Sequence, residues 1–163
     1  MDIMTQLAGW QINPPLIEHQ PLFTCDDADR LLLDRPGTRL KNLFLRDNYG
    51  RRHALLLTSP DKQVDLKALS TQLDWSRIGF ASAERLQRYL GVEPGHVSVL
   101  ALVNDTEQAV ELWLDKDLID SDDFHCHPLR NCATVLLSKV DLLHFAEQTG
   151  HEPQWLAIPE RTA

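Results

Sequence analysis

Short runs rich in apolar residues, separated by turn residues, predict most of the strands in this chain. The clearest pair covers residues 41–46 and 52–58, which are rich in Leu and are joined by a segment with Asn48 and Gly50. Asn and Gly favour tight turns, so this pattern predicts a β-hairpin. Two further runs, 97–103 and 109–114, are predicted to pair around a turn at Asn104-Asp105. The other predicted strands are residues 16–19, 77–81, 124–127, 133–138 and 154–158.

Helices are predicted where a capping residue precedes an amphipathic run. Asp65 is predicted to cap a helix through Leu73, and Ser82 a helix over 83–90 that Gly91 ends. The other predicted helical segments are 1–9, 24–33, 116–119 and 139–149, the last with Val140, Leu143, Phe145 and Ala146 near one face and with Gly150 at its end. Strands interspersed with helices predict an α+β fold, with a mixed, mainly antiparallel sheet wrapped by helices.

Composition indicates a soluble protein of one domain, residues 1–163. Hydrophobic residues make up 43% of the chain and charged residues 25%, as in ordinary globular proteins. The start of the chain, Met1–Trp10, has no basic segment followed by an apolar run, and no apolar run is long enough to cross a bilayer. Three cysteines, Cys25, Cys126 and Cys132, favour reduced thiols. We therefore expect a cytoplasmic protein with no membrane partner.

The charge is distributed unevenly. The net charge of −8 argues against a general nucleic-acid-binding protein, whose affinity comes from neutralising phosphates. Residues 30–67, however, hold nine Lys or Arg and four acidic residues, so this segment carries +5. Such a basic face could bind one RNA end while the acidic remainder repels other RNA. The alternative is an ordinary solvated hairpin.

Lys41 stands out among the candidate functional residues. Alternate residues of a strand share a face, so Lys41 lies in line with Leu43 and Leu45, and Asn42 with Phe44. A lysine on an apolar face is unfavourable unless it lies at a sheet edge, forms a pair or binds a ligand. The alternative is a lysine at the strand end whose ammonium reaches water.

The segment His125-Cys126-His127 allows two kinds of chemistry. The two histidines point the same way from a strand, and Cys132 or His96 could complete a zinc site, but the usual close pair of cysteines is missing. Cys126 could be a nucleophile, although a buried structural cysteine is the commoner case. The sequence has no Gly-x-Ser-x-Gly motif and no glycine-rich phosphate loop.

Seven short motifs in order carry a resemblance over residues 16–158. They are Glu18-His-Gln-Pro-Leu-Phe-Thr24, Lys41-Asn-Leu-Phe-Leu-Arg-Asp47, Phe80-Ala-Ser82, Leu90-Gly-Val92 with Pro94-Gly-His-Val-Ser98, Ala101-Leu-Val-Asn-Asp105, His127-Pro-Leu-Arg-Asn131 and Gly150-His-Glu-Pro153. The chain resembles the YbaK and prolyl-tRNA-synthetase-associated editing domain superfamily, in its free-standing ProX-like branch. The family usually has a proline where this chain has Val99, and His96 replaces a smaller residue.

The resemblance implies which residues form the site. It places Lys41 at the family's functional lysine, which contacts the terminal nucleotide, and Asn42, Gly95, Ser98 and His127 at positions that line the pocket. We expect catalytic roles for Lys41 and His127. We expect substrate binding by Asn42, Gly95, His96, Ser98 and Asn131, and tRNA binding by Arg46, Arg51, Arg52 and Arg77.

The function implied by the resemblance is trans-editing of mischarged tRNA(Pro), most simply alanyl-tRNA(Pro). An aminoacyl ester is already activated, so we expect hydrolysis by water without a metal or cofactor, through orientation and a few hydrogen-bond donors. The expected partners are the acceptor end of tRNA(Pro) and, transiently, prolyl-tRNA synthetase. Three alternatives stay open: an inactive tRNA-binding module of this fold, a deacylase for Ser or Cys, and a metal-dependent hydrolase.

Overall fold

The structure is a computed structural model that describes residues 2–18, 37–129 and 133–161. The helix predicted over residues 24–33 lies outside these ranges, as do Cys25, Asn131 and Cys132. Within the described ranges, no helix is both long and apolar enough to cross a membrane.

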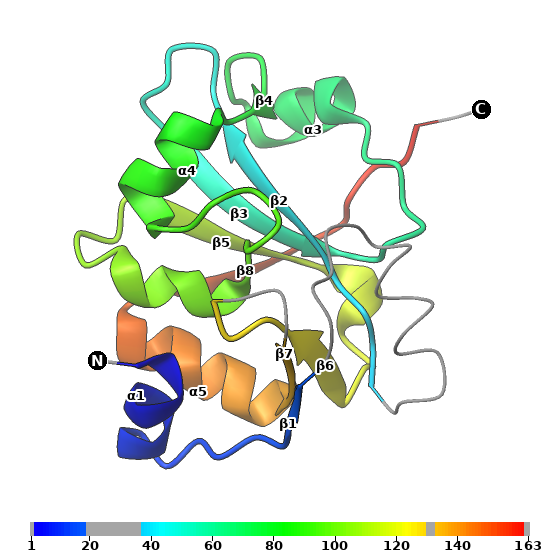
Figure 1. The fold of residues 1–163 in the computed structure, drawn as a ribbon. Helices are drawn as coiled ribbons and strands as arrows, with labels where there is room; N and C mark the ends of the chain where they lie inside the picture. The colour runs from blue at the N-terminus through cyan, green and yellow to red at the C-terminus, as the bar shows by residue number, and fades with distance from the viewer. Residues whose placement is uncertain (1, 19–36, 130–132, 162–163) are drawn as a thin grey trace.

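Two sheets form the centre of the fold (Figure 1). The larger has the order β4 (Gly79–Phe80), β2 (Lys41–Arg46), β3 (His53–Thr58), β5 (Val110–Asp115) and β8 (Pro153–Leu156). β3 pairs with β2 antiparallel and with β5 parallel, and β5 pairs with β8 parallel, so this sheet is mixed. The smaller sheet is antiparallel, with the order β1 (Leu16–Glu18), β7 (Ala133–Ser138) and β6 (Asp123–Cys126). The predicted α+β class is confirmed.

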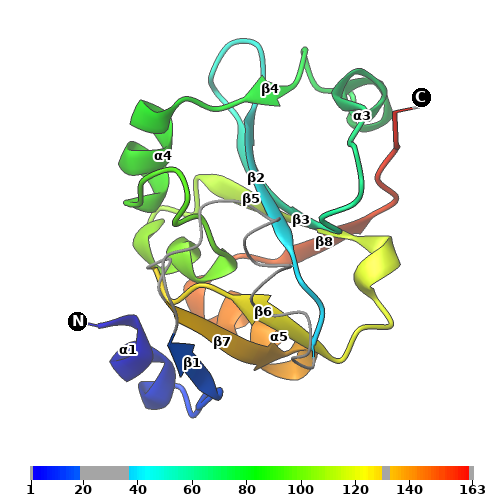
Figure 2. The same ribbon diagram turned by 45° about the vertical axis from the view of Figure 1, so that its right-hand side comes forward.

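The larger sheet has a hydrophobic core on each face. On one face α3 (Leu66–Leu73) packs through Leu69 against Leu45, Leu56 and Trp113. The other face packs against α4 (Ala83–Leu90), the 3-10 helix η1 (Val99–Asn104), α5 (Lys139–Thr149) and α1 (Ile3–Gly9). Figure 2 shows α3 and α4 on opposite sides of β2. A single 3-10 turn, η2 (Lys116–Leu118), follows β5.

The predicted helix caps are present. The side chain of Asp65 accepts a hydrogen bond from the Ala68 N–H, and that of Ser82 from the Arg85 N–H. Gly91 and Gly150 end α4 and α5 in the left-handed conformation, at φ 67° and 80°, which glycine adopts without strain. Local capping chemistry therefore sets the boundaries of these helices.

Several predicted elements are corrected. Residues 97–103 are not a strand: Ser98 caps a 3-10 helix over 99–104, and its first four residues are buried. A continuously apolar run has no period that separates a buried strand from a buried helix. β5 consequently pairs with β3 and β8, not with that segment. The strand predicted over 77–81 is only Gly79–Phe80, and Val140 on α5 is 75% exposed.

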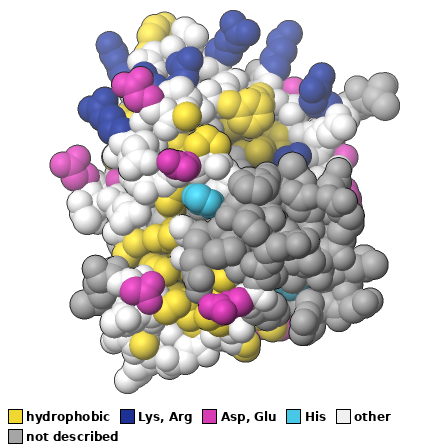
Figure 3. Space-filling model, viewed as in Figure 1, with side chains coloured by type: hydrophobic (Ala, Val, Ile, Leu, Met, Phe, Trp, Pro, Cys, Tyr) yellow, Lys and Arg dark blue, Asp and Glu magenta, His cyan; other side chains and the backbone are white. Residues whose placement is uncertain are grey.

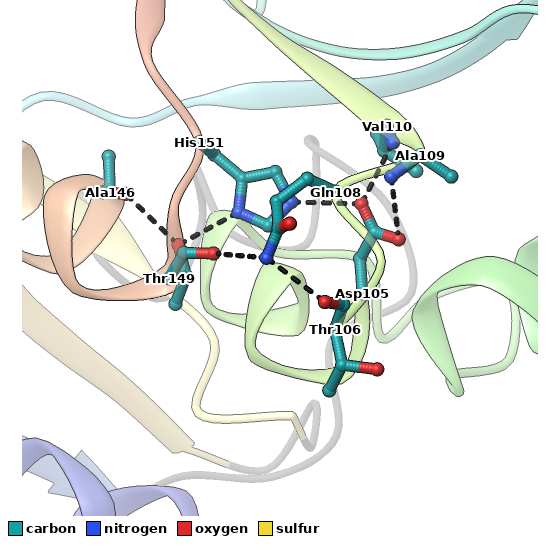
Figure 4. A network of polar contacts seen from close by, with 8 residues as sticks. All are labelled: Asp105, Thr106, Gln108, Ala109, Val110, Ala146, Thr149 and His151. Carbon is teal, nitrogen blue, oxygen red and sulfur yellow. Dashed lines mark hydrogen bonds and ion pairs between the residues drawn. The ribbon is translucent and has the colours of Figure 1, made fainter.

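A buried polar network ties the end of α5 to the start of β5 (Figure 4). The Asp105 carboxylate, 5% exposed, accepts hydrogen bonds from the backbone N–H groups of Ala109 and Val110 and lies 2.8 Å from His151 Nε2. His151 Nδ1 lies 2.9 Å from Thr149 Oγ1. These contacts join segments more than 40 residues apart in the sequence.

Candidate active site

Lys41 is the first residue of β2, at a point where one edge of the strand has no paired strand in the described ranges. β4 pairs only with Leu45 and Arg46, so no strand of the described ranges lies beside residues 41–43. The register puts Lys41 opposite Thr58 of β3. Lys41 is half-buried and shares its face with Leu43 and Leu45, as alternation predicted. The lysine is therefore both on an apolar face and at a sheet edge.

A buried ionic network supports Lys41. Its Nζ donates a hydrogen bond to the backbone carbonyl of Lys62 at 2.7 Å. Lys62 is 6% exposed, and its ammonium lies 2.7 Å from one carboxylate oxygen each of Asp115 and Asp117. The Thr58 hydroxyl donates to the same Asp115 oxygen at 2.6 Å. Burial alone would lower the pKa of Lys62, but its bonds to Asp115 and Asp117 outweigh this and raise the pKa.

Lys41 also lines a pocket of about 380 Å³, which we call the Lys41 pocket. Its walls include Leu43, Asp65, Lys67, Phe80 and Arg161. In the described ranges Lys41 forms no ion pair, since the acceptor of its hydrogen bond is a neutral carbonyl. Its positive charge is therefore available to an anion that enters the pocket.

Asn42 lies on the opposite face of β2, with Phe44. Its register partner is Leu57, and Leu57 and Phe44 belong to the same core as Val99, Leu100 and Cys126. The Asn42 Oδ1 atom is buried and has no hydrogen-bond partner in the described part of the chain. A buried polar atom without a partner is unfavourable, so it is a natural contact for a bound donor.

The loop before η1 packs on the same side of the larger sheet as Asn42 and Phe44. Gly95 has φ 92°, and the His96 N–H donates to the Glu93 carbonyl, so residues 93–96 form a tight turn with glycine at the position that needs positive φ. Ser98 is 1% exposed, and its hydroxyl oxygen accepts from the Leu100 N–H. The structure thus gives Gly95 and Ser98 a clear part in shaping this loop, and His96 is half-buried beside them.

His127 follows directly after β6. Its Nδ1 lies 3.3 Å from the carbonyl oxygen of Ala133, which can only accept, so this nitrogen carries the proton. The lone pair of the neutral ring is then on Nε2, as a general base requires. Cys126 beside it is buried, and burial raises its pKa to about 12. Because the thiolate is the reactive form, Cys126 is a core residue and no nucleophile.

The segment before Lys41 lies beside β6, the strand before His127. Thr38 forms a parallel bridge with Phe124, and the His125 N–H donates to the Thr38 carbonyl at 2.9 Å. Lys41 and His127 each come three residues after the bridged residue of their own segment. The topology therefore positions both predicted catalytic residues from one common contact.

The predicted RNA-binding arginines lie toward the other end of the hairpin. Figure 3 shows Lys and Arg side chains along the upper edge of that view, over the β2–β3 turn, α4 and α3. Arg51 and Arg77 are exposed, and Arg46 is half-buried with bonds to the carbonyls of residues 47 and 48. Arg52 is already engaged: it pairs with Glu111 at 3.0 Å and stacks over Trp75 at 4.3 Å.

Two further arginines near the β2–β3 turn, Arg85 and Arg88, were not predicted from the sequence. Arg85 of α4 donates to the Gly50 carbonyl and lies 3.2 Å from His53 Nε2, which fixes it beside the hairpin turn. Arg88 is exposed one turn further along the helix. The spacing of these two arginines, three apart on a predicted helix, was the signal that could have identified them. Phe80, Lys67 and Arg161 had no such signal, since they come from separate elements.

The described ranges contain no group of three His, Cys, Asp or Glu side chains arranged to hold a metal ion. Cys132, one candidate ligand, lies outside them. The prediction of hydrolysis without a metal therefore stays a prediction.

Known proteins resemble this chain over nearly its whole length. The family model for the aminoacyl-tRNA editing domain matches residues 19–145. The prolyl-tRNA editing protein ProX of Acetoanaerobium sticklandii is 36% identical over 149 residues, which cover 91% of each chain. Prolyl-tRNA synthetase associated domain-containing protein 1 of Danio rerio is 36% identical over 149 residues, 90% of this chain and 80% of that protein.

A solved structure shares the fold. It is a candidate trans-editing enzyme for prolyl tRNA synthetase, with a TM-score of 0.74 and 18% identity, and the match covers 98% of this chain and 96% of that one. The family match and the two sequence relatives bear out the resemblance seen in the motifs. The chain belongs to the aminoacyl-tRNA editing domain family, whose members are aminoacyl-tRNA deacylases.

Proposed function

We propose that the protein hydrolyses alanyl-tRNA(Pro) in trans, releasing alanine and uncharged tRNA. The names of the relatives, a prolyl-tRNA editing protein and a prolyl-tRNA synthetase associated protein, support the choice of tRNA. The observation that carries the proposal is the Lys41 ammonium, which lines a pocket and has a neutral carbonyl as its hydrogen-bond partner. It is suited to bind the terminal phosphate of the acceptor end, because a point charge on a flexible stem tolerates several phosphate positions.

At residues 41–43 one edge of β2 has no paired strand in the described part of the chain, so one substrate could contact both faces of the strand there. Lys41 and Asn42 are neighbours whose side chains point to opposite faces. A ligand that lies across the edge can contact Lys41 on one side and Asn42 on the other. The phosphate would then lie at Lys41, and the aminoacyl ester near Asn42, the loop 95–98 and His127.

The chemistry requires only water and orientation. A water oxygen attacks the ester carbonyl carbon, the bond to the ribose oxygen breaks, and that oxygen takes up a proton as free alanine leaves. His127 Nε2 is suited to accept the proton of the attacking water, because Nδ1–H is directed to the Ala133 carbonyl. The Asn42 side chain can position the substrate through its buried oxygen.

The choice of alanine rests on size. Alanine is smaller than proline, so a synthetase pocket built for proline excludes it poorly, and a second, smaller pocket completes a double sieve. Serine and cysteine are the nearest alternatives, because each adds one polar atom to the alanine side chain. A transient contact with prolyl-tRNA synthetase is part of the proposal, since it would deliver mischarged tRNA before release.

The test is a deacylation assay on purified tRNA(Pro) charged separately with alanine, serine, cysteine or proline. We expect alanine to be released fastest and proline to be retained. The same assay after exhaustive treatment with EDTA should give an unchanged rate. Faster release of serine or cysteine would reassign the substrate, and a loss with EDTA that zinc restores would overturn the metal-free mechanism. No release from any of the four would leave an inactive RNA-binding module.

A further inference from the structure

Phe80 is an exposed aromatic side chain at the outer edge of the larger sheet. It is 62% exposed on β4, where it pairs with Leu45 of β2 and forms part of the Lys41 pocket. Its backbone is held on both sides, since Gly79 pairs with Arg46 and the Ala81 N–H donates to the Phe44 carbonyl. An aromatic ring that projects into solvent from this fixed backbone, beside a pocket, offers a flat surface for a ligand.

Three positive side chains surround the same pocket. Lys67 comes from α3, Arg161 from the segment after β8, and Lys41 from β2. The Arg161 backbone is fixed, because its N–H donates to the Gln63 carbonyl at 2.8 Å. The acid in the wall, Asp65, has its carboxylate on the Ala68 N–H at 3.0 Å, where it caps α3. The pocket is therefore positively charged beside an aromatic ring.

Positive side chains beside an exposed aromatic ring are typical of sites that bind single-stranded nucleic acid. Proteins bind unpaired nucleotides with cations that contact the backbone and with aromatic rings on which bases stack. The pocket volume of about 380 Å³ lies within the range of roughly 300–1,000 Å³ that is usual for small-ligand sites. A deep apolar ligand fits less well, because the ring is mostly exposed.

The position of the pocket also suits the path of an RNA end. Arg46 is at one end of β2, next to the β2–β3 turn over which Figure 3 shows Lys and Arg side chains, and Lys41 is at the other end. Phe80 pairs beside Leu45, between these two points. Along a strand, Leu45 and Lys41 are about 13 Å apart. An RNA strand that passes from the basic surface to Lys41 would therefore cross Phe80 before it reaches the ester.

We propose that the Lys41 pocket binds an unpaired nucleotide next to the terminal adenosine of the substrate RNA, with its base stacked on Phe80 and its phosphate near Lys67 and Arg161. This inference rests on the proposed function, because it assigns the pocket to the acceptor end of the same substrate. It adds a subsite that acts in binding and not in bond cleavage.

Two substrates of different length test the subsite. For alanyl-tRNA(Pro), Phe80→Ala should raise KM about tenfold, equivalent to about 1.4 kcal/mol, with kcat within twofold of the wild type. For alanyl-adenosine monophosphate, which lacks the preceding nucleotide, the variant and the wild type should have equal kcat/KM. Phe80→Tyr should restore most of the loss. Val140→Ala, at an exposed apolar residue on α5, is the matched control.

Binding of uncharged RNA separates this inference from the proposed function. By fluorescence anisotropy, Phe80→Ala should weaken binding of tRNA(Pro) about tenfold but should not weaken binding of tRNA(Pro) that lacks its three unpaired 3′ nucleotides. Lys67→Ala should lower the salt dependence of binding to the complete tRNA, and the exposed Lys116→Ala should not.

Three results would overturn the subsite. The first is an equal KM for alanyl-tRNA(Pro) in Phe80→Ala and the wild type, and the second is a loss of kcat/KM by Phe80→Ala on alanyl-adenosine monophosphate as large as on alanyl-tRNA(Pro). The third is a loss of affinity for the truncated tRNA as large as for the complete tRNA. The last would indicate that Phe80 contacts the stem or a protein partner. An enzyme inactive on both charged substrates would refute the proposed function, while the anisotropy experiment would still decide whether Phe80 binds the unpaired end.

Discussion

The ammonium of Lys41 donates a hydrogen bond to the backbone carbonyl of Lys62, whose own ammonium is buried between Asp115 and Asp117. Two lysines thus come close together without sharing an anion: Lys62 pairs with the buried Asp115 and the exposed Asp117, and Lys41 forms no ion pair in the described ranges. The arrangement fixes the position of Lys41 through the backbone of its neighbour. It also separates stability, to which Lys62 contributes, from the substrate binding proposed for Lys41, so the two side chains can be changed one at a time.

Replacement of Lys41 tests substrate binding. Lys41→Ala should lower deacylation of alanyl-tRNA(Pro) about a hundredfold, a loss of roughly 2.7 kcal/mol of transition-state stabilisation, because the ester loses its orientation. The free energy of unfolding should fall by only about 1 kcal/mol, since one hydrogen bond to a carbonyl is lost. Lys41→Arg should restore activity in part. Near-normal turnover by a well-folded Lys41→Ala protein would refute the role.

Replacement of Lys62 tests the supporting network. Lys62→Met should lower the free energy of unfolding by about 3 kcal/mol, because it leaves the fully buried Asp115 without its counter-charge. Urea titrations of Lys62→Met and of Lys67→Met, an exposed lysine nearby, make the comparison, and the second should stay within about 0.5 kcal/mol of the wild type. Equal stabilities would mean that the ion pairs contribute nothing.

The network around Asp105 predicts a dependence of stability on pH. Burial alone would raise the pKa of Asp105, but hydrogen bonds from His151, Val110 and Ala109 outweigh it and hold the pKa below its usual 3.8. The carboxylate therefore contributes its full stability above about pH 4. That contribution is lost as the pH falls further, through the lower pKa of the folded state.

Asp105→Asn should therefore lower the free energy of unfolding at pH 7 by about 2 kcal/mol, and the difference from the wild type should narrow below pH 4. Urea titrations at pH 7, 5, 4 and 3 measure it. Asp120→Asn, at an exposed acid, is the control. A difference that stays constant down to pH 3 would rule out the ionised form as the source of the stability.

A pair of neighbouring arginines tests the basic surface. Arg51 is exposed beside Tyr49, whereas Arg52 is paired with Glu111. Arg51→Gln should weaken binding of tRNA(Pro) and reduce the slope of log K against log salt by about one. Arg52→Gln should change this slope less, because its charge is already neutralised. Equal slopes for Arg51→Gln and the wild type would show that Arg51 does not contact the RNA and that its charge is only solvated.

Replacement of Val99 tests whether the loop 95–98 sets the amino-acid preference. It is the first residue of η1, where proline is well tolerated, and Ser98 before it is extended at φ −155° and ψ 155°, as a residue before proline must be. Val99→Pro should therefore fold normally and stiffen the loop 95–98. In the deacylation assay it should raise the ratio of alanine to serine release above that of the wild type. An unchanged ratio would show that this loop does not set selectivity.

Local signals predicted much of the fold. The capping residues Asp65 and Ser82 and the glycines at 91 and 150 set helix ends that the structure confirms. Residues 97–103 were assigned to the wrong element because residues 99–103 are all apolar and show no period, and Ser98 was not recognised as a helix cap. The parallel pairing of β5 with β3 and β8 was also beyond prediction, since no local pattern specifies a partner so far along the chain.

The candidate site, like the fold, could be predicted only in part. Strand alternation correctly put Lys41 and Asn42 on opposite faces of one strand. The support from Lys62 could not be predicted, because it acts through a backbone carbonyl 21 residues away. The pocket wall formed by Phe80, Lys67 and Arg161 likewise exists only after three separate elements have packed together. Asn131 lies outside the described residues, so its part in substrate binding stays a prediction.

The parallel pairing of β8 with β5 has a consequence for the order of folding. The β2–β3 hairpin joins residues close in sequence and can form within microseconds. β8 reaches β5 only after the chain has passed through the smaller sheet and α5, so its docking requires a long loop to close. Until then the edge of β5 is exposed and can pair with another chain. We therefore expect refolding yield to fall with protein concentration, through aggregation at this edge before β8 covers it.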